Sequence, residues 1–210
     1  MEVYTESIKT TSHKKALYLS YFTVGYNVLE GLVSVLVGIV SGSIALVGFG
    51  LDSFVESFSG GVMVWRFRKA GLLSDKEHER REVVAIKFVA YSFFLFGSYV
   101  LYESVKTLYL VEIPNPSLLG IIIAIISIIV MPTLYYQKKK VGKSLGSSSL
   151  VADSKQTLAC MFLSIALLAG LGLNYLYSIW WADPIVGLFI GAFLFKEGYS
   201  TLKEEKVCSC

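Results

Sequence analysis

The chain is poor in charged residues and in cysteine. Only 17% of its 210 residues are Asp, Glu, Lys or Arg, whereas 54% are hydrophobic, and the mean hydropathy is +0.62. This balance is too apolar for a water-soluble domain of that size and indicates a membrane protein with several spans. The three cysteines form no disulfide framework, because Cys160 lies in a hydrophobic run and Cys208 and Cys210 lie at the end of the chain.

A cleavable signal peptide is also missing. The first fifteen residues are polar and no apolar core precedes His13-Lys14-Lys15. We therefore expect residues 1–15 to form a cytoplasmic tail, residues 16–202 to form the membrane domain, and residues 203–210 to form a second cytoplasmic tail that bears two cysteines. No segment is left over for a folded soluble domain after the last span.

Six apolar segments are long enough to cross a bilayer, for which a helix needs about 20 residues. The segments run from 16 to 40, 43 to 66, 83 to 108, 117 to 136, 148 to 173 and 184 to 202. We predict an all-α membrane protein of six transmembrane helices. The fourth segment has almost no polar side chain, so we expect it to face lipid.

The connections between these segments alternate in charge. Lys and Arg are absent around 41–42, 112–116 and 174–183, whereas the N-terminal tail, the 66–82 loop, the 137–147 loop and the C-terminal tail carry several. By the positive-inside rule, this alternation predicts that both termini lie in the cytoplasm, which requires an even number of spans. We expect the two Lys/Arg-rich loops to be short, solvated links.

Two carboxylates, Asp52 and Glu56, lie one helical turn apart within the second apolar segment. Residues at i and i+4 of a helix point the same way. Ionised carboxylates are costly in hydrocarbon, so they indicate a polar cavity, a partner or an ion. The segment offers this pair no basic partner. We therefore favour binding of a metal ion or of protons over a buried polar pair satisfied by neighbouring hydroxyls and amides.

The fifth apolar segment carries Asp153, Gln156 and Cys160 on one helix face, at i, i+3 and i+7. The second and fifth segments cross the membrane in opposite directions. At a rise of about 1.5 Å per residue, Asp153, Gln156 and Cys160 lie near the midplane, at the same heights as Asp52 and Glu56. Two alternatives stay open: Asp153 as a helix N-cap and Cys160 as a small buried apolar residue.

The ligand types in this predicted cluster favour a borderline divalent metal. Carboxylate, thiolate and amide oxygen ligands suit Zn²⁺, with Co²⁺, Cd²⁺, Mn²⁺ and Fe²⁺ as other candidates, and the thiolate disfavours hard ions such as magnesium. Such ligands must lose their protons before they bind metal. Protons would therefore compete with the metal for the same groups, which predicts exchange of metal for H⁺.

Four polar residues outside this cluster have weaker predicted roles. Asn27 and Glu30 in the first segment either line the same pathway or bond neighbouring helices, and we expect an accessory role. Cys208 and Cys210 either capture cytosolic metal or form an idle tail.

The entry to the sixth segment has features of helix structure rather than of chemistry. Asp183-Pro184 is typical of an N-cap followed by proline at the first helical position. Gly187 and Gly191 are spaced for close contact between two membrane helices.

Together these motifs resemble the cation diffusion facilitators, six-span exporters of divalent metals that work as homodimers. The run Ser41–Leu46 followed by Leu51–Glu56 resembles their second span, where an acid-x-x-x-acid pair binds metal. Ser149–Cys160 resembles their fifth span, and Asp183–Gly187 resembles the entry to the sixth. The resemblance implies metal efflux through the cell membrane by a homodimer, without a prosthetic group or nucleic acid partner.

Two departures from the family pattern bear on function. Gln156 and Cys160 stand where histidine and aspartate usually stand, which implies a different metal preference and proton stoichiometry. The cytoplasmic domain that most members carry after the sixth span is not present in this sequence. The resemblance therefore points to a shorter branch of the family, in which dimerisation and metal sensing rest on the spans or are lost.

Two functions of other classes compete with transport. A di-aspartyl intramembrane protease would use Asp52 and Asp153, but Leu51 separates Gly50 from the acid in the superficially similar glycine-acid motif. The estimated depths also place the two aspartates roughly 8 Å apart along the membrane normal. The other alternative is a metal-binding membrane protein that regulates a partner without transport of its own.

Overall fold

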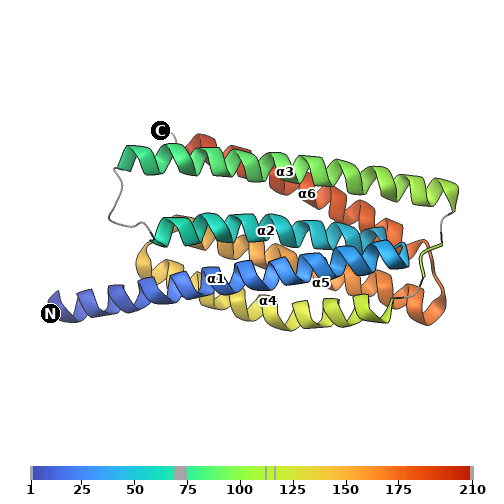
Figure 1. Cartoon of the computed structure of the whole chain (residues 1–210), viewed down its shortest axis with the longest axis horizontal. Helices are drawn as coiled ribbons and strands as arrows, with labels where there is room; N and C mark the ends of the chain where they lie inside the picture. The colour runs from blue at the N-terminus through green and yellow to red at the C-terminus, as the bar shows by residue number, and fades with distance from the viewer. Residues whose placement is uncertain (1, 69–74, 112, 116, 209–210) are drawn as a thin grey trace.

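The structure, a computed structural model, consists of six long α-helices (Figure 1). It describes residues 2–68, 75–111, 113–115 and 117–208, with no strand in these ranges. The helices are α1 (Glu2–Ser41), α2 (Ile44–Arg68), α3 (Asp75–Leu110), α4 (Leu118–Leu145), α5 (Ser148–Tyr177) and α6 (Ala182–Cys208). The predicted all-α, six-helix architecture is thus confirmed.

Successive helices run in alternate directions along the long axis of the bundle. The start of α1 and the end of α6 consequently lie at the same end (Figure 1). The most extensive packing joins α1 to α2, α3 to α6 and α4 to α5. α2 also packs against α3, α5 and α6, which makes it the central helix.

Three helical segments of the described chain are long and apolar enough to cross a membrane by length and composition. They are His13–Ser41, Leu118–Leu145 and Asp153–Tyr177, which belong to α1, α4 and α5. α2 is 25 residues long, but Asp52, Glu56 and its serine and glycine residues lower its hydropathy. The polar groups that would form a site thus also make α2 less apolar than these three helices.

The fourth helix is longer than predicted, and the expected solvated loop at 137–147 is wrong. α4 continues through Pro132 and through a lysine-rich turn until Gly146, whose left-handed backbone (φ 63°) ends the helix. Lys and Gln favour helix, so nothing before that glycine stops it. One face of α4 is buried in the bundle, at Gly120, Ala124, Ser127, Met131, Leu134, Lys138 and Gly142. The expectation that the segment faces lipid is therefore wrong for this face of α4.

Helical structure also extends beyond the other predicted boundaries. α2 continues to Arg68 and α3 begins at Asp75, so only 69–74 of the predicted 66–82 loop lies outside the described residues. α1 begins at Glu2 and α6 ends at Cys208, so most of both predicted tails continues the adjoining helices.

Glycines bring α3 and α6 together, as their spacing predicts. A Cβ added to Gly191 would lie 2.7 Å from Leu101 Cγ, and one added to Gly97 would lie 2.8 Å from Phe195 Cδ2. A Cβ on Gly187 would collide with Ser104 Oγ. The two backbones approach too closely for side chains at these positions.

Asp183 caps α2 and not its own helix. It lies inside the first turn of α6, and its Oδ2 accepts hydrogen bonds from the backbone N–H groups of Ile44 (2.9 Å) and Ala45 (3.4 Å). Its Oδ1 accepts a hydrogen bond from Ser43 Oγ. The prediction of an N-cap for the sixth helix is wrong, because the unpaired N–H groups that this carboxylate satisfies belong to a neighbouring helix.

Replacing Asp183 by alanine is expected to destabilise the bundle. The change leaves two buried N–H groups of α2 and the Ser43 hydroxyl without their acceptor, which costs about 1–3 kcal/mol for each unsatisfied group. The melting temperature of the purified protein in detergent should fall clearly. Ser98→Ala, which removes an exposed hydroxyl on α3, is the control, and equal melting temperatures for both variants would contradict the capping role.

Candidate functional site

Asp52 and Glu56 are buried in the protein. Asp52 is 4% exposed and Glu56 is 0% exposed. They lie on α2, the helix that contacts four others at the centre of the bundle (Figure 1). The two carboxylates therefore share a buried face of their helix, as the i, i+4 spacing predicts.

A polar stripe on α5 faces the interior of the bundle. Asp153, Thr157, Cys160 and Ser164 are all at most 4% exposed, and they follow the helical repeat at i, i+4, i+7 and i+11. Gln156 lies beside this stripe and is only partly buried. The predicted stripe is thus correct at Asp153 and Cys160, whereas Thr157 takes the central place expected for Gln156.

α2 and α5 bring their polar groups to matching heights. The Thr157 hydroxyl donates a hydrogen bond of 2.6 Å to Glu56 Oε1. Ser59, nearly one turn further along α2, donates one of 3.0 Å to Asp153 Oδ1. The two helices therefore run antiparallel and side by side, and their acids lie at similar depths in the bundle, as predicted.

Cys160 lies about one turn beyond Thr157 on the stripe, in the direction of Asp52. The residue is 1% exposed and lies on the face of α5 that carries Asp153 and Thr157. One thiol and two carboxylates are thus buried on two helices that pack against each other. These are ligand types that a borderline divalent metal accepts.

A fully buried lysine completes the cluster. Lys138 on α4 is 0% exposed, and its Nζ lies 2.9 Å from Asp153 Oδ2 and 3.6 Å from Glu56 Oε1. The same ammonium donates a hydrogen bond of 2.8 Å to Thr157 Oγ1. The expectation that the acids lack a basic partner is therefore wrong. The lysine escaped prediction because α4 continues past the predicted end of its span.

Glu30 on α1 is buried and accepts hydrogen bonds from two hydroxyl groups. It is 6% exposed, its Oε1 accepts a hydrogen bond of 2.8 Å from Tyr26, and its Oε2 accepts one of 3.0 Å from Ser53. Ser53 neighbours Asp52 in the sequence. Glu30 therefore lines the interior next to the acids of α2, as its predicted accessory role requires.

Asn27 is buried at the height of Glu56. Val24 lies against Gly60, and α1 and α2 run antiparallel, so Asn27 comes level with Ser57, the residue next to Glu56. The residue is 0% exposed, and neither atom of its amide finds a hydrogen-bond partner among the described residues. A buried amide without partners is costly. It therefore indicates a place where a ligand or a moving side chain completes the bonding.

Other buried atoms of the cluster are also unpaired within the described ranges. Glu56 Oε2 and Gln156 Nε2 have no hydrogen-bond partner there. Across the same part of the chain, no three His, Cys, Asp or Glu side chains lie close enough together to hold a metal ion. Glu56 and Asp153 instead share the ammonium of Lys138. This arrangement neutralises the carboxylates with a lysine from the protein itself.

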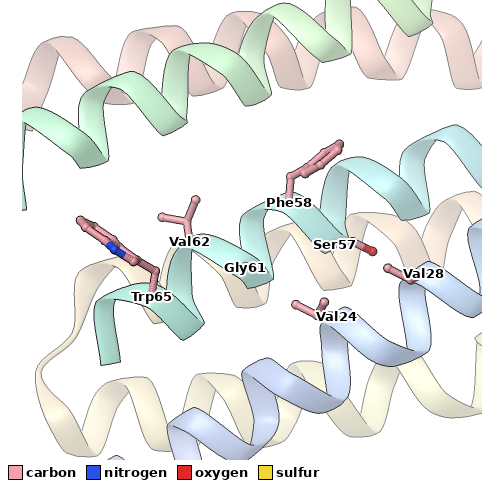
Figure 2. A pocket seen from close by; sticks show the side chains of 7 residues that line it. All are labelled: Val24, Val28, Ser57, Phe58, Gly61, Val62 and Trp65. Atoms are coloured by element: carbon pink, nitrogen blue, oxygen red, sulfur yellow. The ribbon is translucent and has the colours of Figure 1, made fainter. Parts of the chain in front are cut away.

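A separate cavity of about 540 Å³ opens between α1 and α2. Figure 2 shows its lining: Val24 and Val28 on α1, and Ser57, Phe58, Gly61, Val62 and Trp65 on α2. One hydroxyl is the only polar side-chain group among these residues besides the indole N–H. The cavity therefore offers a cation no carboxylate or thiol ligand, and it is not a metal site.

The cysteine tail lies beyond what the structure describes. Cys208 ends α6 without a described side chain, and Cys210 lies outside the described residues. Capture of metal by this tail stays a prediction.

Asp52 and Asp153 lie apart along the bundle. Glu56 is level with Thr157 and Ser59 with Asp153, so Asp52 lies about two helical turns from Asp153, roughly 10 Å along the axis. Two aspartates that share one catalytic water must lie much closer. The geometry therefore disfavours the di-aspartyl protease.

The chain is similar to known transport proteins over most of its length. Residues 20–206 match the family model of the cation efflux transmembrane domain. The chain is 22% identical over 192 residues to transmembrane protein 163 of Xenopus laevis, which covers 91% of this chain and 67% of that protein. It is 25% identical over 180 residues to the cation-efflux pump FieF of Shewanella oneidensis, covering 81% and 60%.

A third relative extends the comparison. The chain is 24% identical over 204 residues to the uncharacterized transporter YdbO of Bacillus subtilis, covering 95% of this chain and 68% of that protein. The chain thus spans 60% to 68% of the length of these three relatives. The family is one of transporters and not of enzymes, and its matched domain is a transmembrane domain. This chain is an integral, multi-pass membrane protein that belongs to the cation efflux family.

Proposed function

We propose that this chain exports divalent metal cations, zinc above all, from the cytoplasm across the cell membrane in exchange for protons. One observation carries the proposal: the chain matches a cation efflux domain, and Asp52, Glu56 and Cys160 are almost fully buried on two antiparallel helices that pack against each other. Buried carboxylates in a membrane domain mark an ion pathway by default.

Asp52 and Glu56 are the main ligands in this proposal, and Cys160 adds a thiolate. Gln156 supplies an amide oxygen after a change of rotamer, and Asp153 is a further ligand or the entrance. Asn27 and Glu30 line the pathway beside them. The unpaired Glu56 Oε2 and the unpaired Asn27 amide support this reading, because a bound cation with its remaining water would give both groups a partner.

All six helices act as spans in the proposal, with both termini in the cytoplasm. The start of α1 and the end of α6 lie at one end of the bundle (Figure 1), and the Lys/Arg-rich connections lie at that end as well. This distribution agrees with the positive-inside rule. The chain works as a homodimer in this view, with α2 and α5 rocking against their neighbours to open the site to each side in turn.

Proton exchange follows from the ligand set. Carboxylates and a thiol buried away from water bind protons when the metal leaves, because the charged forms are costly in the interior. Each turnover then carries metal outward and protons inward through the same side chains. A pH gradient that is acidic on the outer side would drive export.

The proposed function is tested by metal flux into proteoliposomes. Zn²⁺, Co²⁺, Cd²⁺ and Mn²⁺ are compared with and without a pH gradient, for the natural chain and for Asp52→Ala. We expect zinc flux that the gradient accelerates, and a decrease of about ten-fold or more in the variant, since even outer partners of metal ligands contribute 10- to 100-fold. Undiminished zinc flux in Asp52→Ala would remove the mechanism, and zinc binding without flux would favour a regulatory protein.

A further inference from the structure

We infer that Lys138 is a tethered competitor of the transported cation: its ammonium binds Glu56, a main ligand of the metal in the proposed function, and Asp153, a further ligand or the entrance. The inference rests on the proposed function and adds to it a residue from α4. Neither the acids of α2 nor the polar stripe of α5 implies such a residue.

The geometry of Lys138 is that of a bound cation. Its Nζ lies within 4.0 Å of two carboxylates from two different helices, Asp153 Oδ2 at 2.9 Å and Glu56 Oε1 at 3.6 Å. It also donates to Thr157 Oγ1 at 2.8 Å, and that hydroxyl in turn donates to Glu56 Oε1 at 2.6 Å. Three oxygen atoms therefore surround one positive charge, as they would surround a metal ion.

Burial of this lysine requires a reason beyond stability. Lysine is almost never fully buried unless it is paired, yet Lys138 is 0% exposed. Buried ion pairs are often no more stabilising than apolar side chains of the same volume. The neighbouring Lys139 and Lys140 show that α4 accommodates lysine outside the core, at half-buried and exposed positions. A buried lysine among the acids is therefore explained by a role in charge balance.

The lysine and a metal ion exclude each other at this position. A divalent cation that bound Glu56 and Asp153 would lie within a few ångströms of the ammonium, and like charges repel strongly in a low-dielectric interior. The side chain of lysine is long and flexible, and α4 ends about 10 Å beyond it. Lys138 can therefore swing toward that end of the bundle when the cation enters.

Exchange of one cation for another would help both halves of the transport cycle. Without metal, the ammonium compensates one charge of Glu56 and Asp153 and holds their helices together, and protons bind the remaining groups. When metal is bound, its charge compensates the acids, and the returning ammonium of Lys138 then helps to expel the metal. Lys138 thus lowers metal affinity in order to permit release.

The test compares Lys138→Met with Lys139→Met in the full chain. Lys139 is a neighbour on α4 that bonds Tyr135 instead of the acids. Affinity for Zn²⁺ and Co²⁺ is measured by equilibrium binding in detergent, and the melting temperature is measured with a chelator and with each metal. Lys138→Gln and Lys138→Arg are measured alongside, because glutamine keeps a hydrogen-bond donor without the charge and arginine keeps the charge.

We expect Lys138→Met and Lys138→Gln to bind metal about ten-fold or more tightly than the natural chain. Both variants should have a lower melting temperature in chelator than the natural chain, and added metal should raise that temperature more. Their maximal flux should fall. Lys138→Arg and Lys139→Met should keep affinities near the natural value. A merely structural lysine would alter the melting temperature alone.

The outcomes that would overturn the inference differ from the outcome that would overturn the proposed function. If the natural chain transports zinc but Lys138→Met and Lys138→Gln bind it no more tightly, Lys138 is no competitor and the inference fails alone. If either variant is too unstable to purify in chelator, rescue by metal still supports the inference, and lack of rescue overturns it. If the natural chain neither binds nor transports metal, the proposed function itself fails.

Discussion

Replacing Glu56 by glutamine is expected to decrease zinc flux at least about ten-fold while the protein stays folded. Glutamine matches the shape of Glu56 and keeps an oxygen that accepts the 2.6 Å hydrogen bond from Thr157. It removes the charge that a cation would bind, although Lys138 keeps Asp153 as its partner. Flux into proteoliposomes and the melting temperature in detergent, measured on the same preparation, separate lost transport from lost folding.

Glu56→Ala extends this prediction to stability. Alanine leaves a cavity at a fully buried position, together with an unsatisfied Thr157 hydroxyl. Removing one member of a buried ion pair typically costs about 3–5 kcal/mol, so this variant should melt much earlier than Glu56→Gln. The control is Glu103→Gln, which breaks a partly exposed pair with Lys106 on α3. Such pairs contribute only about 0–1 kcal/mol, and equal effects at positions 56 and 103 would argue against a special role for the central carboxylate.

Replacing Cys160 by serine is expected to change which metal is transported. The thiolate favours zinc and cadmium, whereas a hydroxyl favours harder ions such as manganese. Flux of zinc and cadmium should therefore fall about ten-fold relative to that of manganese. Competition among the metals in proteoliposomes measures the order of metal preference directly, independently of how much active protein each preparation contains.

Ser164→Ala is the matched control for the thiol. Ser164 lies one turn further along the same stripe and donates to Ser127 on α4, so its removal perturbs the same helix contact without a change of ligand type. The order of metals should stay as in the natural chain. If Cys160→Ser also left the order unchanged, the thiol would be a packing residue, which is the alternative that its burial among apolar side chains allows.

The part of the site that follows from helical spacing could be predicted from the sequence. Asp52 and Glu56 share a face because they are one turn apart. Asp153 and Cys160 share the face of α5 that meets them because their spacing fits the same repeat. Depth also follows from counting residues, since each residue adds a fixed rise, and the bonds from Thr157 to Glu56 confirm the matching heights.

What could not be predicted depends on which helices are neighbours. Lys138 belongs to the site because α4 continues about two and a half turns past the predicted apolar segment and packs against α5, and neither fact is visible in local composition. The capping of α2 by Asp183 could not be predicted for the same reason, because the carboxylate and the N–H groups that it satisfies are far apart in sequence. The local sequence indicates that such groups need partners, but the packing of the helices determines which partners they have.

The contact of Asp183 with the start of α2 gives that helix a fixed pivot. Glu56 lies twelve residues from Ile44, about 18 Å along the helix axis. A tilt of about 10° around the pivot would carry its carboxylate sideways by roughly 3 Å, which is more than enough to break the bond to Thr157. A small rotation of α2 about this pivot would therefore be amplified at the level of Glu56.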